Sequence, residues 1–280
     1  MAQTQMQARE WDLGLATEAQ LRAESKTQHP PFFGYSLFRS ICGEFLGMML
    51  FLFMVISVAR FSSNRSDEDN AGEQNATVML IATAFGLSIF VLVYMLVDVS
   101  GAHLNPAVSI GLLVGRRISI ERFLIYLVTQ MAGAVAGASI ATTFLSSTGG
   151  GFNAIADGVS AGDAFGGEVL CTFLLVTTVF SACDGALSRR SPHTGPLLPL
   201  VIGTAVLLAH LVMIPIDGCS INPARSFATA VTNNEWDDHW VFWLGPLLGG
   251  VLATVVWEAV LRPDQAVVEE QKQIIQAATV

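Results

Sequence analysis

A tripeptide that occurs twice decides the fold, once as Asn105-Pro106-Ala107 and once as Asn222-Pro223-Ala224. Asparagine is a favoured N-cap, and proline is tolerated in the first turn of a helix. Each copy therefore predicts the start of a short helix, near 105–115 and near 222–232. The N-terminal end of a helix carries a partial positive charge and unpaired backbone N–H groups. Two such ends that face each other would attract oxygen atoms and repel cations.

The composition around these tripeptides is that of a membrane protein. The chain has 280 residues, of which 52% are hydrophobic and 13% are charged, and its mean hydropathy is +0.55. A helix needs about 20 mostly apolar residues to cross a bilayer. Six stretches meet this condition, at 38–60, 77–99, 122–145, 166–183, 197–216 and 239–261. We therefore expect an all-α membrane protein with six transmembrane helices, plus two helices too short to cross.

The two halves of the chain resemble each other. Glu44 lies 61 residues before Asn105, and Glu168 lies 54 residues before Asn222. Each half contributes three spans, so the second half enters the membrane from the opposite side, which predicts an inverted repeat. Re-entrant backbone is tolerated at membrane depth only where protein buries it or water bathes it. Two re-entrant half-helices therefore require a polar path between them.

Two carboxylates are expected inside the membrane. Glu44 and Glu168 would by default suggest a proton relay or an ion site, and a membrane enzyme or proton-coupled carrier built on them and His210 is one alternative function. Their spacing offers no nucleophile–base pair. The symmetry of the two halves favours a scaffold role, in which each carboxylate accepts hydrogen bonds from irregular backbone. Two glycine pairs, Gly133-x-x-x-Gly137 and Gly245-x-x-x-Gly249, predict close helix packing.

The arginines indicate the orientation in the membrane. Cytoplasmic loops carry an excess of basic residues, and the basic residues between spans cluster after the second and the fourth, at Arg116, Arg117, Arg122, Arg189 and Arg190. Both termini then face the cytoplasm. We expect a cytoplasmic segment at 1–37, a channel domain at 38–262 and a cytoplasmic tail at 263–280. The loop after the first span is outside, where Asn64 begins a sequon and is a candidate for glycosylation.

The residues around the two tripeptides resemble those of the major intrinsic protein family, the aquaporins. The stretches that carry the resemblance are Ser100-Gly101-Ala102-His103-Leu104-Asn105-Pro106-Ala107-Val108 and Gly218-Cys219-Ser220-Ile221-Asn222-Pro223-Ala224-Arg225-Ser226-Phe227. The resemblance implies six tilted helices, two half-helices and one pore per subunit of a homotetramer. It implies no cofactor, no metal and no nucleic acid; the partners would be water, membrane lipid and further copies of the chain.

The resemblance also implies a selectivity filter. Its four positions, carried over by their distance from the tripeptides, are Phe85, His210, Cys219 and Arg225. An aromatic ring and an imidazole narrow the opening against glycerol, and a permanently charged guanidinium repels cations. A passive water channel that excludes protons, ions and glycerol is therefore expected, with Cys219 as a mercury-sensitive thiol on the pore wall. A channel for peroxide or ammonia, and a structural junction protein with a vestigial pore, are the alternatives.

The cytoplasmic loops are similar to those of plant plasma-membrane aquaporins, which suggests that membrane as the location. Ser119 follows Arg116-Arg117-Ile118 in the form of a kinase site, 14 residues beyond Asn105, and matches a gating serine of those proteins. His193 lies 29 residues before Asn222 and matches a loop histidine that closes the pore when protonated. The resemblance thus implies gating by loop movement, by a protein kinase at Ser119 and by acid at His193.

Overall fold

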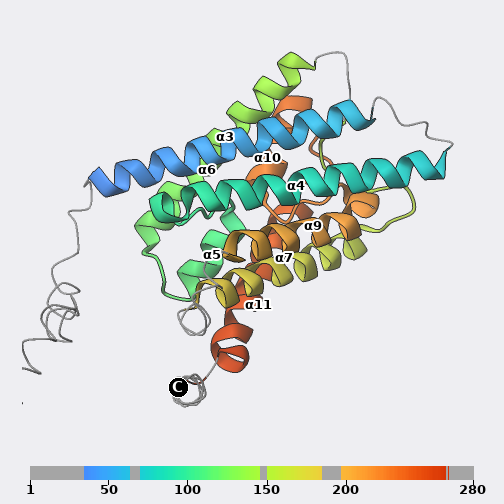
Figure 1. Cartoon of the computed structure of the whole chain (residues 1–280). Coiled ribbons are helices and arrows are strands. Elements are labelled where there is room, and N and C mark those ends of the chain that lie inside the picture. Colours follow the sequence, from blue (N-terminus) through green and yellow to red (C-terminus); the bar gives the residue numbers. More distant parts are fainter. Residues whose placement is uncertain (1–34, 64–69, 146–149, 185–196, 263, 265–280) are drawn as a thin grey trace, which may run out of the picture. The chain divides into compact units, whose positions relative to one another are not determined.

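The computed structural model describes residues 35–63, 70–145, 150–184, 197–262 and 264 (Figure 1). The chain divides into two units, Met1–Phe38 and Arg39–Val280. The contacts reported below lie within the second unit.

Every regular element in the described ranges is a helix. The first half of the chain contains α3 (Tyr35–Ser63), α4 (Ala71–Ser100), α5 (Pro106–Val114) and α6 (Ile120–Phe144). The second half contains α7 (Ala161–Cys183), α9 (Leu198–Asp217), α10 (Pro223–Asn233) and α11 (Val241–Val256), which continues as a π-helical turn at Trp257–Leu261. All of these except α5 and α10 are long and apolar enough to cross a membrane. The predicted six spans and two short helices are confirmed.

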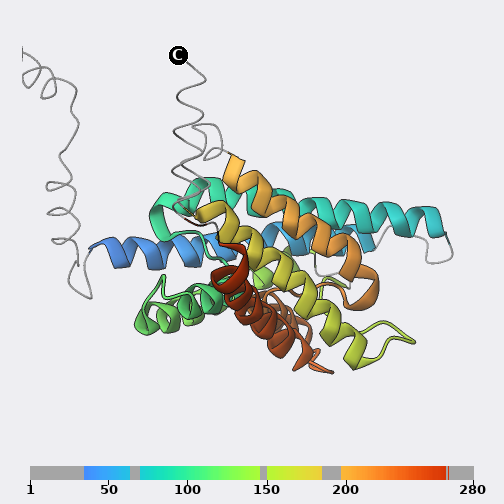
Figure 2. The same cartoon turned by 90° about the horizontal axis from the view of Figure 1, so that it is seen from below.

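The helices of the second half pack both against each other and against those of the first. Helix α7 lies between α9 and α11, and α4 lies along α9, so the two halves are joined by long helix pairs (Figures 1 and 2). The short helix α5 packs on α11, and α10 packs on α6. Each half-helix therefore contacts a spanning helix of the other half, as an interlocked repeat requires.

Large apolar side chains point outward along single faces of the spanning helices. On α11 they recur every four residues, at Leu244, Leu248 and Leu252, which are 55%, 41% and 41% exposed. Residues four apart share one face of a helix. Contiguous apolar surface of this kind is rare on soluble monomers, and here it provides the lipid-facing surface of the bundle.

Glycines bring two helix pairs into backbone contact. A Cβ added at Gly133 would meet the carbonyl oxygen of Phe45, and one added at Gly137 would meet that of Met49, so α6 can approach α3 only through these glycines. In the second half, Gly249 of α11 touches the carbonyl of Val169 on α7 in the same way. The close packing predicted from the glycine pairs is confirmed.

Candidate functional site: a cavity between two half-helices

Asparagine caps both half-helices. The Oδ1 atom of Asn105 accepts the backbone N–H of Ala107 at 2.8 Å, and α5 begins at Pro106. The Oδ1 atom of Asn222 accepts the N–H groups of Ala224 and Arg225 at 3.1 and 3.3 Å, and α10 begins with a proline as well. The local chemistry expected from the tripeptides is therefore present in both halves.

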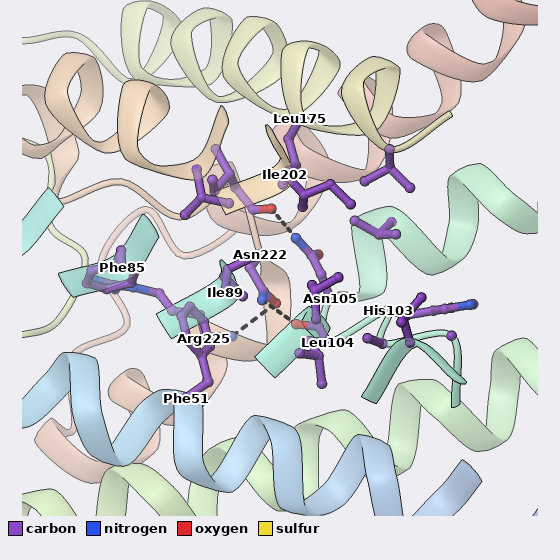
Figure 3. Close-up of a pocket in the computed structure, with 18 of the residues that line it drawn as sticks. Phe51, Phe85, Ile89, His103, Leu104, Asn105, Leu175, Ile202, Asn222 and Arg225 are labelled. Carbon is purple, nitrogen blue, oxygen red and sulfur yellow. Dashed lines mark hydrogen bonds between the residues drawn. The ribbon is translucent and has the colours of Figure 1, made fainter. Parts of the chain in front are cut away.

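Each asparagine also reaches across to the other half. Nδ2 of Asn105 donates to the carbonyl of Ile221 at 2.7 Å, and Nδ2 of Asn222 donates to the carbonyl of Leu104 at 2.9 Å. The two re-entrant segments are thus joined by a reciprocal pair of buried hydrogen bonds, drawn as dashed lines in Figure 3. Each bond satisfies a carbonyl that has no partner in its own half-helix.

The backbone before each asparagine follows the same unusual path. Gly101 and Gly218 have φ values of 88° and 79°, and the residues directly before Asn105 and Asn222, Leu104 and Ile221, have φ values of 49° and 45°. Left-handed backbone is strained for residues with a side chain. Its recurrence at matching positions means that the two segments share one conformation, held in place by outside contacts.

Those contacts come from the two buried glutamates. Glu44 accepts the backbone N–H groups of His103 and Leu104 at 3.0 and 2.8 Å, and Glu168 accepts those of Ser220 and Ile221, each at 2.6 Å.

Glu44 is further bound by the Oγ of Ser100 at 2.7 Å and by Nε2 of Gln130 at 2.8 Å. Neither glutamate lines the cavity. Both glutamates thus accept hydrogen bonds from the irregular backbone that precedes a half-helix.

A narrow cavity of about 70 Å³ runs along the two half-helices. In Figure 3 Asn105 and Asn222 lie side by side within it, between Arg225 on one side and His103 on the other. Its other walls are mostly apolar, and they include Phe51, Ile89, Val93, Val108, Leu175, Val179 and Ile202. A path with a few convergent polar groups on an apolar wall gives a solute few places to hydrogen bond.

Three of the four predicted filter residues meet at one part of this cavity. The rings of Phe85 and His210 lie 3.9 Å apart between centroids, inclined by 31°, and the guanidinium carbon of Arg225 lies 5.6 Å from the Phe85 ring. Nδ1 of His210 lies 2.8 Å from the carbonyl of Val206. Because a carbonyl only accepts, Nδ1 carries the proton and Nε2 is left as an acceptor.

The fourth residue, Cys219, does not line this cavity. Its side chain is completely buried and is not among the described residues that line the cavity. The backbone at Cys219 has a φ of 56°, and its N–H is held by Oδ1 of Asp217 at 2.9 Å. The distance along the chain predicts Cys219 as a lining residue of the filter, whereas the cavity is lined by its neighbours Ser220 and Ile221. The cavity is also lined by the thiol-bearing residue Cys183, which is exposed.

The predicted regulatory residues are placed only in part. Ser119 is exposed and caps α6, because its Oγ accepts the N–H of Arg122 at 3.3 Å. His193 and Asn64 lie outside the described residues, as do most of the two predicted terminal segments. The gating and glycosylation expectations for them remain predictions from the sequence.

Two further features of the structure were not predicted from the sequence. Asn153, in the loop before α7, accepts a hydrogen bond from the guanidinium of Arg225; nothing in its spacing points to the filter. At the opposite end of α7, four alternating charges form a network of ion pairs of 2.7 to 3.6 Å, comprising Arg117, Asp184, Glu258 and Arg262. Exposed ion pairs contribute little to stability individually. Asp184, however, is buried, with a side chain that is 6% exposed, and it caps the C-terminal end of α7, which its ion pairs connect to Arg117 and Arg262.

A six-span bundle with two capped half-helices that meet at a shared cavity is the architecture of a membrane channel. The family model described as "Major intrinsic protein" matches residues 33–257, and the chain belongs to this family. It is therefore an aquaporin channel, an integral membrane protein and not an enzyme.

Relatives and solved structures agree with this assignment. Aquaporin PIP2-1 of Arabidopsis thaliana is 43% identical over 237 residues, which cover 81% of this chain and 83% of the relative. Aquaporin PIP2-7 of Musa acuminata is 44% identical over the same length, with the same coverage. The structure of the aquaglyceroporin from Plasmodium falciparum has a TM-score of 0.70 and covers 83% of this chain and 99% of its own, at 23% identity. This last likeness concerns the fold alone.

Proposed function

We propose that the chain conducts water passively and in single file, and excludes protons, ions and glycerol. The observation that carries the proposal is the meeting of Asn105 and Asn222 in one cavity, each with its amide fixed by backbone. Its similarity to plant PIP2 aquaporins supports the same assignment.

The two asparagines act at the middle of the path. Each amide uses its oxygen for the helix cap and one N–H for the opposite loop. An amide nitrogen has two hydrogens, so one N–H of each side chain remains for a passing water. A water that accepts both bonds turns its own hydrogens toward the two ends of the pore. The hydrogen-bonded chain then reverses direction at this point, which interrupts proton hopping.

The filter acts by size and by hydrogen bonding. Nε2 of His210 and Nε of Arg225 are buried and have no hydrogen-bond partner among the described residues. Leaving a buried polar atom unpaired costs about 1–3 kcal/mol. The first of these atoms accepts and the second donates, so a water molecule, which does both, satisfies the pair. The contact between the rings of Phe85 and His210 narrows the opening beside Arg225 and so limits the size of the solute.

Charge excludes cations at two points. Arg225 keeps its proton at any physiological pH, and it is 2% exposed in a wall of low polarity, where its field is weakly screened. The N-terminal ends of α5 and α10 add partial positive charge where the asparagines meet. Hydronium and metal ions therefore meet two barriers in series, whereas a neutral water meets none.

The remaining parts of the proposal concern assembly and control. We place the channel in the plasma membrane as a homotetramer, with both termini in the cytoplasm. The exposed hydroxyl of Ser119, two residues after Arg117, is accessible to a protein kinase. A phosphate there would lie at the N-terminal end of α6, which favours negative charge.

Stopped-flow light scattering on proteoliposomes tests the function. We expect water permeability well above that of empty vesicles, no uptake of glycerol and no proton flux. Peroxide and ammonia are run as parallel solutes. Vesicles that shrink no faster than empty ones would overturn the water assignment, and rapid glycerol uptake would overturn the narrow filter. Uptake of peroxide or ammonia without water flow would assign the channel to that solute.

A further inference from the structure

We infer that Asn153 is the residue that holds Arg225 in the filter and thereby sets the selectivity of the pore. Asn153 lies in the loop that precedes α7 and is 5% exposed. Its Oδ1 atom accepts from Nη1 of Arg225 and, at 2.7 Å, from Oγ of Ser226. Its Nδ2 atom donates to the carbonyl of Asp217 at 3.1 Å. This inference rests on the proposed role of Arg225.

The neighbours of Asn153 fix which way its amide points. A guanidinium only donates and a backbone carbonyl only accepts. The oxygen must therefore face Arg225, and the nitrogen must face the carbonyl of Asp217. The backbone N–H of Ala154 donates to the same carbonyl at 3.2 Å, so the loop is fastened to the end of α9 at two adjacent residues. The acceptor offered to Arg225 is thus held in one orientation before any solute arrives.

The guanidinium has few other acceptors. Nη2 of Arg225 donates to the carbonyl of Gly218 at 3.2 Å, and Nε has no partner among the described residues. Gly218 belongs to the same re-entrant segment as Arg225, so this bond moves with the segment. Within the described part of the chain, Asn153 therefore supplies the hydrogen bond that ties the guanidinium to an element outside its own segment.

Comparison of the two halves shows why this contact is needed in one of them only. The residue three positions after each asparagine is Val108 in the first half and Arg225 in the second. The serines one position further, Ser109 and Ser226, sit in matching hydrogen-bonded clusters.

In the first cluster, Oγ of Ser109 is bonded by Nε2 of Gln130 at 3.2 Å and lies 3.1 Å from Nδ1 of His103. In the second cluster, Ser226 donates to Asn153 and lies 2.6 Å from Oγ of Ser220. Gln130 donates to the serine of the first half, whereas the Asn153 oxygen accepts from the serine of the second half and also from the charged side chain that the first half lacks. The halves differ here because only the second one carries the filter arginine.

Loss of the Asn153 oxygen would free the guanidinium. A hydrogen bond to a charged group stabilises one arrangement over alternatives by about ten-fold or more. Without it, Arg225 would spend more time away from the position in which it narrows the opening beside Phe85 and His210. Larger neutral solutes would then enter, so the ratio of glycerol to water permeability would rise.

The test compares three variants in proteoliposomes. Asn153→Ala removes the acceptor, and Asn153→Asp keeps an oxygen that pairs with Arg225. Asn233→Ala is the matched control. Asn233 lies on α10, the half-helix that carries Arg225, and its side-chain oxygen accepts a hydrogen bond from another arginine, Arg60, at 3.1 Å. Neither Asn233 nor Arg60 lines the cavity. We expect the glycerol-to-water permeability ratio to rise about ten-fold in Asn153→Ala, and to stay at the parent value in Asn153→Asp and Asn233→Ala.

A second readout does not depend on conduction. An arginine-specific dicarbonyl reagent, with the modified residues mapped by mass spectrometry, reports whether Arg225 is held. We expect Arg225 to be protected in the parent, in Asn153→Asp and in Asn233→Ala, and to react in Asn153→Ala. If Arg225 in Asn153→Ala stays as protected as in the parent, the inference is wrong. It is also wrong if Asn233→Ala loses selectivity to the same degree. A parent channel that conducts no water would overturn the proposed function instead, and Arg225 reactivity alone would then decide the role of Asn153.

Discussion

Nδ2 of Asn105 lies 2.7 Å from the carbonyl oxygen of Ile221, although 116 residues separate the two along the chain. Together with the matching bond from Asn222, this contact holds the two half-helices end to end. The half-helices are too short to cross the membrane, so their position depends on such contacts. The stability of the channel and the geometry of its centre therefore rest on the same few atoms.

Replacing Asn105 should destabilise the protein as well as the pore. Asn105→Ala removes a helix cap and a buried hydrogen bond, and we expect a loss of about 1–3 kcal/mol in the free energy of unfolding. The thermal unfolding midpoint in detergent measures it. Asn75→Ala is the control, because Asn75 is exposed near the start of α4. Equal midpoints for the two variants would mean that the cross-link carries no stability.

Removing a ring from the filter should admit larger solutes. The Phe85 and His210 rings are in contact, so Phe85→Ala and His210→Ala each leave a gap about the size of the lost ring. We expect glycerol uptake to rise by about ten-fold or more over the parent in stopped-flow assays. Leu208→Ala, on an exposed position of the same helix as His210, serves as the control. Either variant remaining closed to glycerol would place the constriction elsewhere.

Mercurial block should act through Cys183 rather than through Cys219. Cys183 lines the cavity and is exposed, whereas the Cys219 side chain is completely buried. A thiol reacts only where a reagent can reach it. We therefore expect Cys183→Ser to remove most of the inhibition of water flow by a mercurial, and Cys219→Ser to leave it. The reverse result would show that the filter turn opens far enough to expose the Cys219 thiol.

Acid should weaken the packing at the start of α11 through His239. Its Nε2 accepts the indole N–H of Trp243 at 3.1 Å, and burial lowers the pKa of His239 from its ordinary value of 6.5. Protonation turns this acceptor into a donor and breaks the bond. The pKa of His239 is lower in the folded state than in the unfolded state, so at higher pH the imidazole is neutral in both and does not change the stability. As the pH drops below about 6.5, the unfolded state binds the proton more readily, and the free energy of unfolding falls.

The control for this acid effect is His239→Gln, whose amide oxygen still accepts from Trp243 but does not titrate. Thermal unfolding and tryptophan fluorescence, measured on both sides of about pH 6.5, compare it with the parent. We expect the parent alone to lose stability with acid at this site. A glutamine variant that loses as much as the parent would assign the effect to other groups.

Gating is tested at two positions, Ser119 and His193, in loops that the sequence predicts to be cytoplasmic. Ser119→Glu adds charge at the N-terminal end of α6, and we expect it to raise water permeability. Ser119→Asn is the control, since asparagine caps a helix without charge. We expect His193→Ala to remove the loss of permeability in acid. If that variant keeps the full acid response, protonation of His193 is not the trigger.

The sequence predicts most of the architecture because hydropathy and helix capping are local. It misses the starts of two spans, since α4 begins at Ala71 and α7 at Ala161, before the apolar runs. Asn70 and Ser160 cap these helices and add a polar first turn that a hydropathy window excludes. Capping signals therefore locate a helix start better than the edge of an apolar run does.

The filter is predicted only in part, for a different reason. Distance along the chain places a residue near the pore, but it does not say where a side chain points when the backbone is left-handed, as at Cys219. Nor does it reveal a partner such as Asn153, which lies 72 residues from Arg225 in a loop without a motif. Contacts of this kind exist only once the helices have packed.

The crossed bonds of the two asparagines also constrain how the protein is made. Leu104 is synthesised 118 residues before Asn222. The hydrogen bond to the carbonyl of Leu104 therefore cannot form until the second half has been translated. The amino-terminal half cannot complete its own re-entrant segment, however well its three spans have inserted. Maturation of the pore is therefore a late, post-insertion event, in which the last half-helix to emerge locks the first.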